Sequence, residues 1–262
     1  MKTNKLITNK NGKDGTTVQA VDRALLLLKL IGENSSPISV KDLSLKSGLN
    51  RTTVWRLIGS LENEGFVDKD IATNSYQLGF TFYRLASQNN PYSSLIRRAR
   101  STLEALREKV GETVLLSVPK HNGILTIDQI DTNHSVRLVD YTNTVTPLHC
   151  TSNGKVQLSL LSKKELEQFL EQELIATSKY TITDPKKLQE ELEWVRSHQV
   201  GLSIGEFDEN ENAISVPIFD SRKNLVAFLT LGGPSFRLSK EDLLNLKDMV
   251  LNAAKDIERQ LT

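Results

Sequence analysis

The chain has 262 residues, of which 38% are hydrophobic and 25% charged, as in a soluble protein with one large or two ordinary domains. No apolar run approaches the roughly 20 residues of a membrane-spanning helix, and the polar start lacks the apolar stretch of a signal peptide. We therefore expect a cytoplasmic protein. The single cysteine excludes an internal disulfide, and four scattered histidines predict no metal site; we expect no cofactor.

The charge is unevenly distributed along the chain. Residues 1–90 carry 12 Lys and Arg against 8 Asp and Glu, whereas residues 91–262 carry 21 against 24. A basic first part and a slightly acidic second part predict that only the first part meets a polyanion.

The first 80 residues predict a disordered tail and a small helical domain. Residues 1–16 are rich in Asn, Lys and Gly, which favours disorder. A first helix then begins near Val18, and Ser39 and Asn50 are suited to cap two more helices. Residues 66–79 predict a β-hairpin, so residues 17–80 have the layout of a winged helix-turn-helix. The predicted core includes Leu25, Leu28, Leu43, Val54, Leu57, Ile58 and Leu61.

The remainder predicts linker helices and an α+β domain. Residues 81–110 form two predicted helices that break at Pro91, with a candidate domain boundary at residues 89–91. Residues 111–262 alternate β-rich runs with capped helices, which predicts an antiparallel sheet with helices against it. The predicted strands include 112–118, 123–130, 135–141, 213–220 and 225–233, and the predicted helices start near 151, span 163–173 and 185–198, and run from 240 to 261.

Taken in order, several segments make the chain resemble the IclR family of bacterial transcriptional regulators over about residues 18–261. They are VQAVDRALLLLKLI, SVKDLSLKSGLNRTTVWRLIGSLENEGFV, YQLG, GETVLLSV, TPLHCTSNGK, TITDP and AISVPIFD followed by LVAFLTLGGP. The resemblance implies a winged-helix domain, a linker helix and a GAF-like ligand-sensing domain. It also implies dimers formed through the DNA-binding half, often paired into tetramers, and regulation by a small metabolite.

One segment departs from the family pattern. The family usually has Gly-hydrophobic-Arg-Cys before the strand that corresponds to AISVPIFD, whereas this chain has the polar and acidic ENEN. The identity of the effector therefore does not transfer from other members.

The start of the third helix carries the side chains expected to meet operator DNA. If Val54 and Ile58 face the core, Thr52, Trp55 and Arg56 lie roughly opposite, where such helices enter the major groove. Arg pairs with guanine edges, and Thr contacts phosphates or a thymine methyl. Trp55 either stacks on the sugar-phosphate or packs beside the first helix. The full predicted set is Ser39, Lys41, Ser44, Arg51, Thr52, Thr53, Trp55, Arg56 and Lys69, with the outlying Ser and Lys side chains on backbone phosphates.

The family's effector pocket implies a second set of residues. Transferred by register, it comprises Leu138, Tyr141, Thr151, Ser152, Asn153, Ser203, Glu211, Ala213, Thr230 and Gly232. Residues 151–155 open a helix, whose free N–H groups suit a carboxylate, although Thr151 or Ser152 could simply cap that helix. Glu211 repels an anion unless it points to solvent, meets hydroxyl or cationic groups, or shares a metal.

These observations predict a regulator of transcription, not an enzyme. We expect a repressor, a homodimer or homotetramer, that binds double-stranded operator DNA and responds to a small-molecule effector. The polar segments around residues 151–155 and 209–213 favour a sugar-derived or other organic acid. His149 and Cys150 are interpreted as structural, with a redox role for Cys150 left open. The alternatives are a GAF-like enzyme and an architectural DNA binder with a vestigial pocket.

Overall fold

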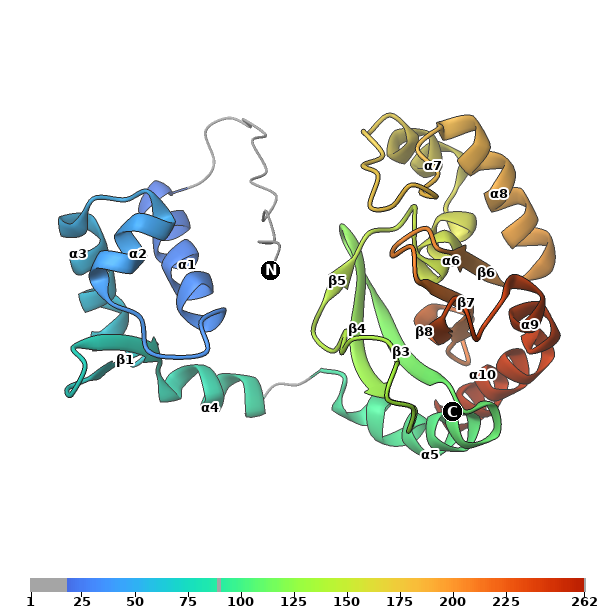
Figure 1. The fold of residues 1–262 in the computed structure, drawn as a ribbon, viewed down its shortest axis with the longest axis horizontal. Helices are drawn as coiled ribbons and strands as arrows, with labels where there is room; N and C mark the ends of the chain where they lie inside the picture. The colour runs from blue at the N-terminus through green and yellow to red at the C-terminus, as the bar shows by residue number, and fades with distance from the viewer. Residues whose placement is uncertain (1–17, 89–90, 262) are drawn as a thin grey trace. The chain divides into compact units, whose positions relative to one another are not determined.

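The structure is a computed structural model that describes residues 18–88 and 91–261, apart from the side chains of residues 86–88. The tail predicted at residues 1–16 lies outside the described residues. The chain divides into two compact units, residues 1–90 and 91–262 (Figure 1). Among the described helices, none combines the length and the apolar character that crossing a bilayer requires.

The first unit is three helices, a hairpin and a fourth helix. Ser39 accepts a hydrogen bond from the Asp42 amide and caps the second helix, and Asn50 caps the third in the same way. Gly48 ends the second helix in the left-handed conformation that its lack of Cβ allows. The elements are α1 (Gln19–Gly32), α2 (Val40–Ser47), α3 (Arg51–Asn63), the antiparallel strands β1 (Val67–Asp70) and β2 (Ser75–Leu78), and α4 (Phe80–Gln88).

The core of this unit differs from the prediction in the orientation of α1. Leu27 and Ile31 are buried against Leu43, Val54 and Ile58, whereas Leu25, predicted as a core residue, is 51% exposed. The run ALLLLKLI is apolar on nearly every side, so its period does not show which side turns inward. The exposed side of α1 is accordingly apolar.

The second unit is built on a six-stranded antiparallel sheet with the strand order β5-β4-β3-β8-β7-β6. Its strands are β3 (Thr113–Lys120), β4 (Gly123–Ile130), β5 (Val145–Thr146), β6 (Gly201–Ile204), β7 (Glu211–Phe219) and β8 (Leu225–Pro234). Its helices are α5 (Ser93–Val110), α6 (Ser152–Leu160), α7 (Lys163–Leu170), α8 (Pro185–His198), α9 (Lys240–Asn245) and α10 (Lys247–Leu261). The predicted α+β class with an antiparallel sheet is thus confirmed.

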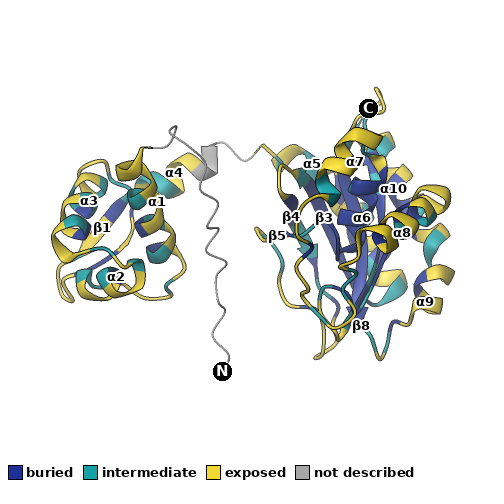
Figure 2. Ribbon diagram, turned by 90° about the horizontal axis from the view of Figure 1, so that it is seen from above, coloured by how far each residue is buried: buried dark blue, intermediate teal, exposed yellow. Residues whose placement is uncertain are grey.

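The two faces of the sheet have different partners. Helices α5 and α10 cover one face, and α6 lies on the other with α8 behind it, so the sheet is the buried layer (Figures 1 and 2). Strand β7 shows the alternation: Ile214, Val216 and Ile218 enter the core under α10, while Ala213 and Ser215 face α6. Polar side chains on the α6 face mark where the functional site lies.

Three predicted elements differ from the structure. Residues 135–141 form an extended loop instead of a strand, because the Gln129 side chain, and not a backbone ladder, binds the Val139 carbonyl (3.1 Å) and the Tyr141 amide (3.0 Å). The predicted helix 163–173 ends at Leu170. The last predicted helix is interrupted at Leu246, which separates α9 from α10.

Candidate functional site

The exposed start of α3 presents cationic and hydroxyl side chains to solvent. Arg51, Thr52 and Arg56 are exposed, and no acidic residue occupies the first turn. Neither guanidinium group makes a hydrogen bond or ion pair with the described part of the chain. Asn50 Oδ1 accepts from the Thr53 amide at 2.8 Å, which fixes the helix start beneath them. The arrangement favours an anionic partner because the helix dipole and both guanidinium groups act in the same direction.

The neighbouring predicted residues fall into two groups. Lys41 and Lys69 are exposed, and Lys69 Nζ lies 6.0 Å from the centre of the Tyr76 ring. Ser39 and Ser44, by contrast, have local roles: the Ser39 hydroxyl donates to Asp42 (2.7 Å), and the Ser44 hydroxyl donates to the Leu49 carbonyl (2.6 Å). Both serines stabilise the helix-turn-helix itself.

Trp55 is the residue for which the sequence left two alternatives open, stacking on the sugar-phosphate or packing beside α1. Its side chain is 65% exposed on α3 and is not among the residues packed in the core of the first unit. The ring thus lies outside the core to which α1 contributes, and Trp55 is on the same helix end as Arg51 and Arg56. An exposed tryptophan next to cations is suited to contact a sugar-phosphate surface.

The first unit also carries an apolar surface on α1 and α4. Val21 and Leu25 of α1 and Phe80 and Tyr83 of α4 are each more than half exposed. Between α1, α3 and α4 lies an open groove of about 770 Å³ lined by Ala20, Val21, Ala24, Leu25, Leu28, Leu61, Phe66 and Phe82. An exposed apolar groove with further exposed apolar side chains on the same helices is characteristic of a protein–protein contact.

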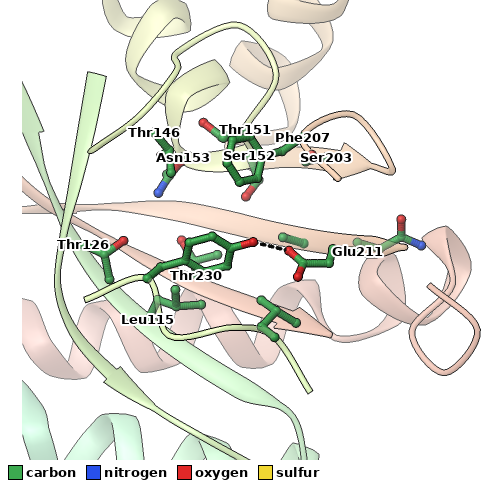
Figure 3. Close-up of a pocket in the computed structure, with 14 residues that line it drawn as sticks. Leu115, Thr126, Thr146, Thr151, Ser152, Asn153, Ser203, Phe207, Glu211 and Thr230 are labelled. Carbon is green, nitrogen blue, oxygen red and sulfur yellow. Dashed lines mark hydrogen bonds between the residues drawn. The ribbon is translucent and has the colours of Figure 1, made fainter. Parts of the chain in front are cut away.

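The second unit contains a cavity on the α6 face of the sheet (Figure 3). Its water-accessible volume is about 60 Å³, and the space between its walls, counted out into open solvent, is about 500 Å³. Its lining comprises Leu115, Thr126, Leu138, Tyr141, Thr146, Thr151, Ser152, Asn153, Ser203, Phe207, Glu211, Asn212, Ala213 and Thr230. Every predicted effector residue except Gly232 is among them; Gly232 adjoins the lining, because an added Cβ there would lie 3.0 Å from the Leu138 side chain.

The start of α6 forms one wall of this cavity. Thr151 caps the helix, accepting from the Gly154 amide (3.3 Å) and donating to the Pro147 carbonyl (2.6 Å). The first intrahelical bond runs from the Lys155 amide to the Thr151 carbonyl, so the amides of Ser152 and Asn153 precede the helical ladder. Thr151 is thus a cap, as one alternative held, and it also lines the cavity.

Buried hydroxyl groups connect α6 to the sheet. The Ser152 hydroxyl lies 2.6 Å from that of Ser215, which lies 2.7 Å from that of Thr230. Asn153 Nδ2 donates to the Ser117 hydroxyl at 3.4 Å. Hydroxyls can reverse their donor and acceptor roles, so this network can adapt to either kind of group on a bound molecule.

The opposite side of the cavity contains one acidic group. The Tyr141 hydroxyl donates to Glu211 Oε2 at 2.7 Å, and Phe207 packs edge-on against the Tyr141 ring. Burial raises the pKa of Glu211 above its usual range, and the Tyr141 hydrogen bond opposes that rise. Burial, and then the bond to Glu211, raise the pKa of Tyr141. Glu211 is therefore not a solvent-directed carboxylate, and no metal-ligand cluster occurs among the described residues.

His149, Cys150 and Lys155, which flank the cavity-lining residues of α6, are structural or unreactive. Burial raises the pKa of the Cys150 thiol to about 11, so the thiolate needed for redox chemistry is scarce at neutral pH. Burial lowers the pKa of His149, whose Nε2 lies 3.0 Å from the Ile175 carbonyl. Lys155, fully buried, pairs with Glu206 (2.7 Å) and Glu191 (3.0 Å) and so ties α6 to the loop that carries Phe207.

Five lining residues are outside the predicted set: Leu115, Thr126, Thr146, Phe207 and Asn212. Leu115 lies on β3 next to buried Val114 and Leu116, and only alternation along the strand distinguishes its face from theirs. Thr126 and Thr146 are hydroxyl residues within β-rich runs, a signal that could have been used. Phe207 is in a loop, where no periodicity predicts the direction of a side chain.

A winged helix-turn-helix unit joined to a unit with a polar-lined cavity is the layout of a transcription regulator. Residues 92–259 match the bacterial transcriptional regulator IclR C-terminal domain, and residues 20–70 match the IclR helix-turn-helix domain. The chain belongs to the IclR family of bacterial transcriptional regulators, which are not enzymes.

Individual relatives match this chain over almost its whole length. The regulator BhcR of Paracoccus denitrificans is 30% identical over 246 residues, which cover 94% of this chain and 88% of BhcR. The transcriptional repressor IclR of Escherichia coli is 28% identical over 249 residues, covering 92% and 89%. An IclR homologue from Microbacterium hydrocarbonoxydans, crystallised with 4-hydroxybenzoate, has the same fold, with a TM-score of 0.79, 21% identity and coverage of 92% and 98%.

Proposed function

We propose that the protein is a repressor that binds a pseudo-palindromic operator through α3 of two copies and loses affinity when a small organic acid occupies the cavity. The exposed Arg51 and Arg56 at the start of α3, without acidic neighbours in the first turn, carry the DNA-binding part of this proposal. A relative named as a repressor supports the sign of regulation. The complex of a homologue with 4-hydroxybenzoate supports an acid as the ligand class.

Two copies would meet through the apolar surface of α1 and α4. That surface exposes Val21, Leu25, Phe80 and Tyr83, which a monomer would leave in water. A dimer formed there places two recognition helices on one operator, and the spacing of the half-sites follows from the dimer geometry. An effector that favours one geometry of the assembly over another would change operator affinity.

The DNA-binding part is tested by selecting operator sequences from random duplexes and measuring affinity by fluorescence anisotropy. Replacing Arg51 and Arg56 by alanine together should weaken specific binding about 100-fold or more, because each side chain that reads a base contributes about 1–3 kcal/mol. The melting temperature should stay unchanged, since both side chains are exposed. Replacing the exposed Lys163 and Lys164 of α7 by alanine removes the same charge and should leave binding unaffected.

The sensing part is tested with a variant that fills the cavity. Ala213→Leu adds three carbons to the cavity lining without removing a side-chain hydrogen bond. We expect this variant to bind the operator normally and to lose the response to any acid that releases wild-type protein. Weak sequence preference in the selection, with no release by any acid, would instead indicate an architectural DNA binder.

A further inference from the structure

The electrostatics of the cavity restrict the kind of acid that can bind in it. No lysine or arginine is among the lining residues, and the charged side chain that lines it, Glu211, is acidic. An anionic ligand would therefore meet a carboxylate, with no lining cation to offset the repulsion. This contrasts with the usual recognition of simple acids by arginine or lysine.

The loop at the cavity mouth adds further negative charge. Residues 205–211 carry Glu206, Asp208, Glu209 and Glu211. Lys155 pairs with Glu206 and Lys179 pairs with Glu209 (2.8 Å), so two of the four carboxylates have a cation. Asp208 and Glu211 have no cationic partner in the described part of the chain, and the charge of Asp208 contributes to the raised pKa of Glu211.

Glu211 is also incompletely hydrogen-bonded. Its Oε2 accepts from Tyr141, while Oε1 receives no hydrogen bond from the described residues. In Figure 3 the carboxylate lies across the cavity from Ser152 and Ser203. One side of the cavity thus offers helix amides and hydroxyls, which suit a carboxylate, and the other offers a free acceptor.

We infer that the effector is a zwitterion, whose carboxylate binds at the start of α6 and whose ammonium group binds Glu211 beside Tyr141. This inference rests on the proposed function of the cavity and narrows its ligand class. The ammonium group supplies the missing cation, donates to Oε1, and leaves the Tyr141 bond in place. Glu211 and Tyr141 are then specificity-determining residues that discriminate against acids without a donor at the far end.

The probes are linear acids of three to six carbons in four series, which differ only in the group at the far end: methyl, hydroxyl, ammonium or a second carboxylate. The four compounds of equal length are compared with one another. Affinity for the full-length protein is measured by calorimetry. We expect the ammonium series to contain the tightest binder, about tenfold or more tighter than its methyl counterpart, and the dicarboxylates to bind worst.

Variants assign the effect to one carboxylate. Glu211→Gln keeps the shape and should lower affinity for the ammonium ligand about tenfold, removing the discrimination between ammonium and hydroxyl. Glu209→Gln neutralises a neighbouring carboxylate that is already paired at the surface and should bind as wild type does. The melting temperature of each variant without ligand confirms that it is folded.

The remaining outcomes overturn the inference. Hydroxyl, methyl or dicarboxylic acids that bind as tightly as the ammonium series would contradict the role of Glu211, yet leave the cavity as a sensor of acids. Failure of every ammonium compound to bind would also overturn it. Neither result bears on the operator measurements. The proposed function is overturned separately, if the wild-type protein shows no sequence-specific DNA binding.

Discussion

Helices α3 and α6 begin in nearly the same way and differ in almost everything around that start. Both have a capping side chain that accepts from the N3 amide, Asn50 in α3 and Thr151 in α6. Arg51 and Thr52, which follow Asn50, are exposed, whereas the residues that follow Thr151 are buried and uncharged until Lys155. An exposed helix start with cations suits a large anion outside the protein, and a buried one with hydroxyls suits a molecule small enough to enter.

The fourth helical position shows the contrast most clearly. In α3 this position is Val54, and in α6 it is Lys155, and both side chains are completely buried. Valine is stabilised by the apolar core around it, but a buried ammonium group is tolerated only because Glu206 and Glu191 surround it. At this position α3 therefore depends on apolar packing, while α6 depends on an ion-pair cluster that also positions the loop beside the cavity.

Replacing Lys155 by methionine should have the largest effect on stability. The change leaves two carboxylates without their cation, one of them buried, and should cost about 3–5 kcal/mol in urea unfolding of the second unit. Lys179→Met breaks another lysine–glutamate pair, which is exposed, and should leave the urea midpoint unchanged. Equal effects of the two variants would show that burial does not distinguish these pairs.

The two caps should differ by a smaller amount. Thr151→Ala removes the cap and also leaves the Pro147 carbonyl without its hydroxyl donor, at a cost of about 2 kcal/mol. Asn50→Ala removes a single exposed bond and should cost about 1 kcal/mol. Hydrogen exchange of the peptides that span α6 and α3 measures each helix separately. A greater loss of protection in α3 would reverse the comparison.

The starts of α3 and α6 also differ in how much of them the sequence predicted. Caps are local, so the residue type and its position before a periodic segment identified Ser39 and Asn50 and left Thr151 as one of two candidates for α6. The exposed face of α3 followed directly from the spacing of Val54 and Ile58. What surrounds a helix start is not local, and neither the ion pairs of Lys155 nor the position of Phe207 has a sequence signature.

The two errors with the widest consequences have physical causes. Helix α1 is apolar on nearly every side, so its period could not show that Leu25 faces outward and Leu27 inward. Residues 135–141 alternate like a strand, but a side-chain amide replaces the backbone ladder there. Most pocket positions came from the family resemblance, which transfers register; the alternation along β7 and β8 then placed Ala213 and Thr230 on the α6 face.

The smallest expected effect concerns pH and the carboxylate opposite α6. Burial raises the pKa of Glu211 in the folded protein, so as the pH rises the Glu211 carboxyl ionises in the unfolded chain before it does so in the folded protein. The free energy of unfolding therefore declines between the pKa of the unfolded state and that of the folded state. Tyr141→Phe removes the hydrogen bond that opposes this rise, so the pKa of Glu211 should increase further and the decline should extend to higher pH. The cost of the variant should therefore be about 1 kcal/mol at pH 8 and smaller at pH 5, as measured by urea unfolding. Glu211→Gln should remove the difference between the two pH values, and a Tyr141→Phe cost that is independent of pH would show that the tyrosine contributes only packing.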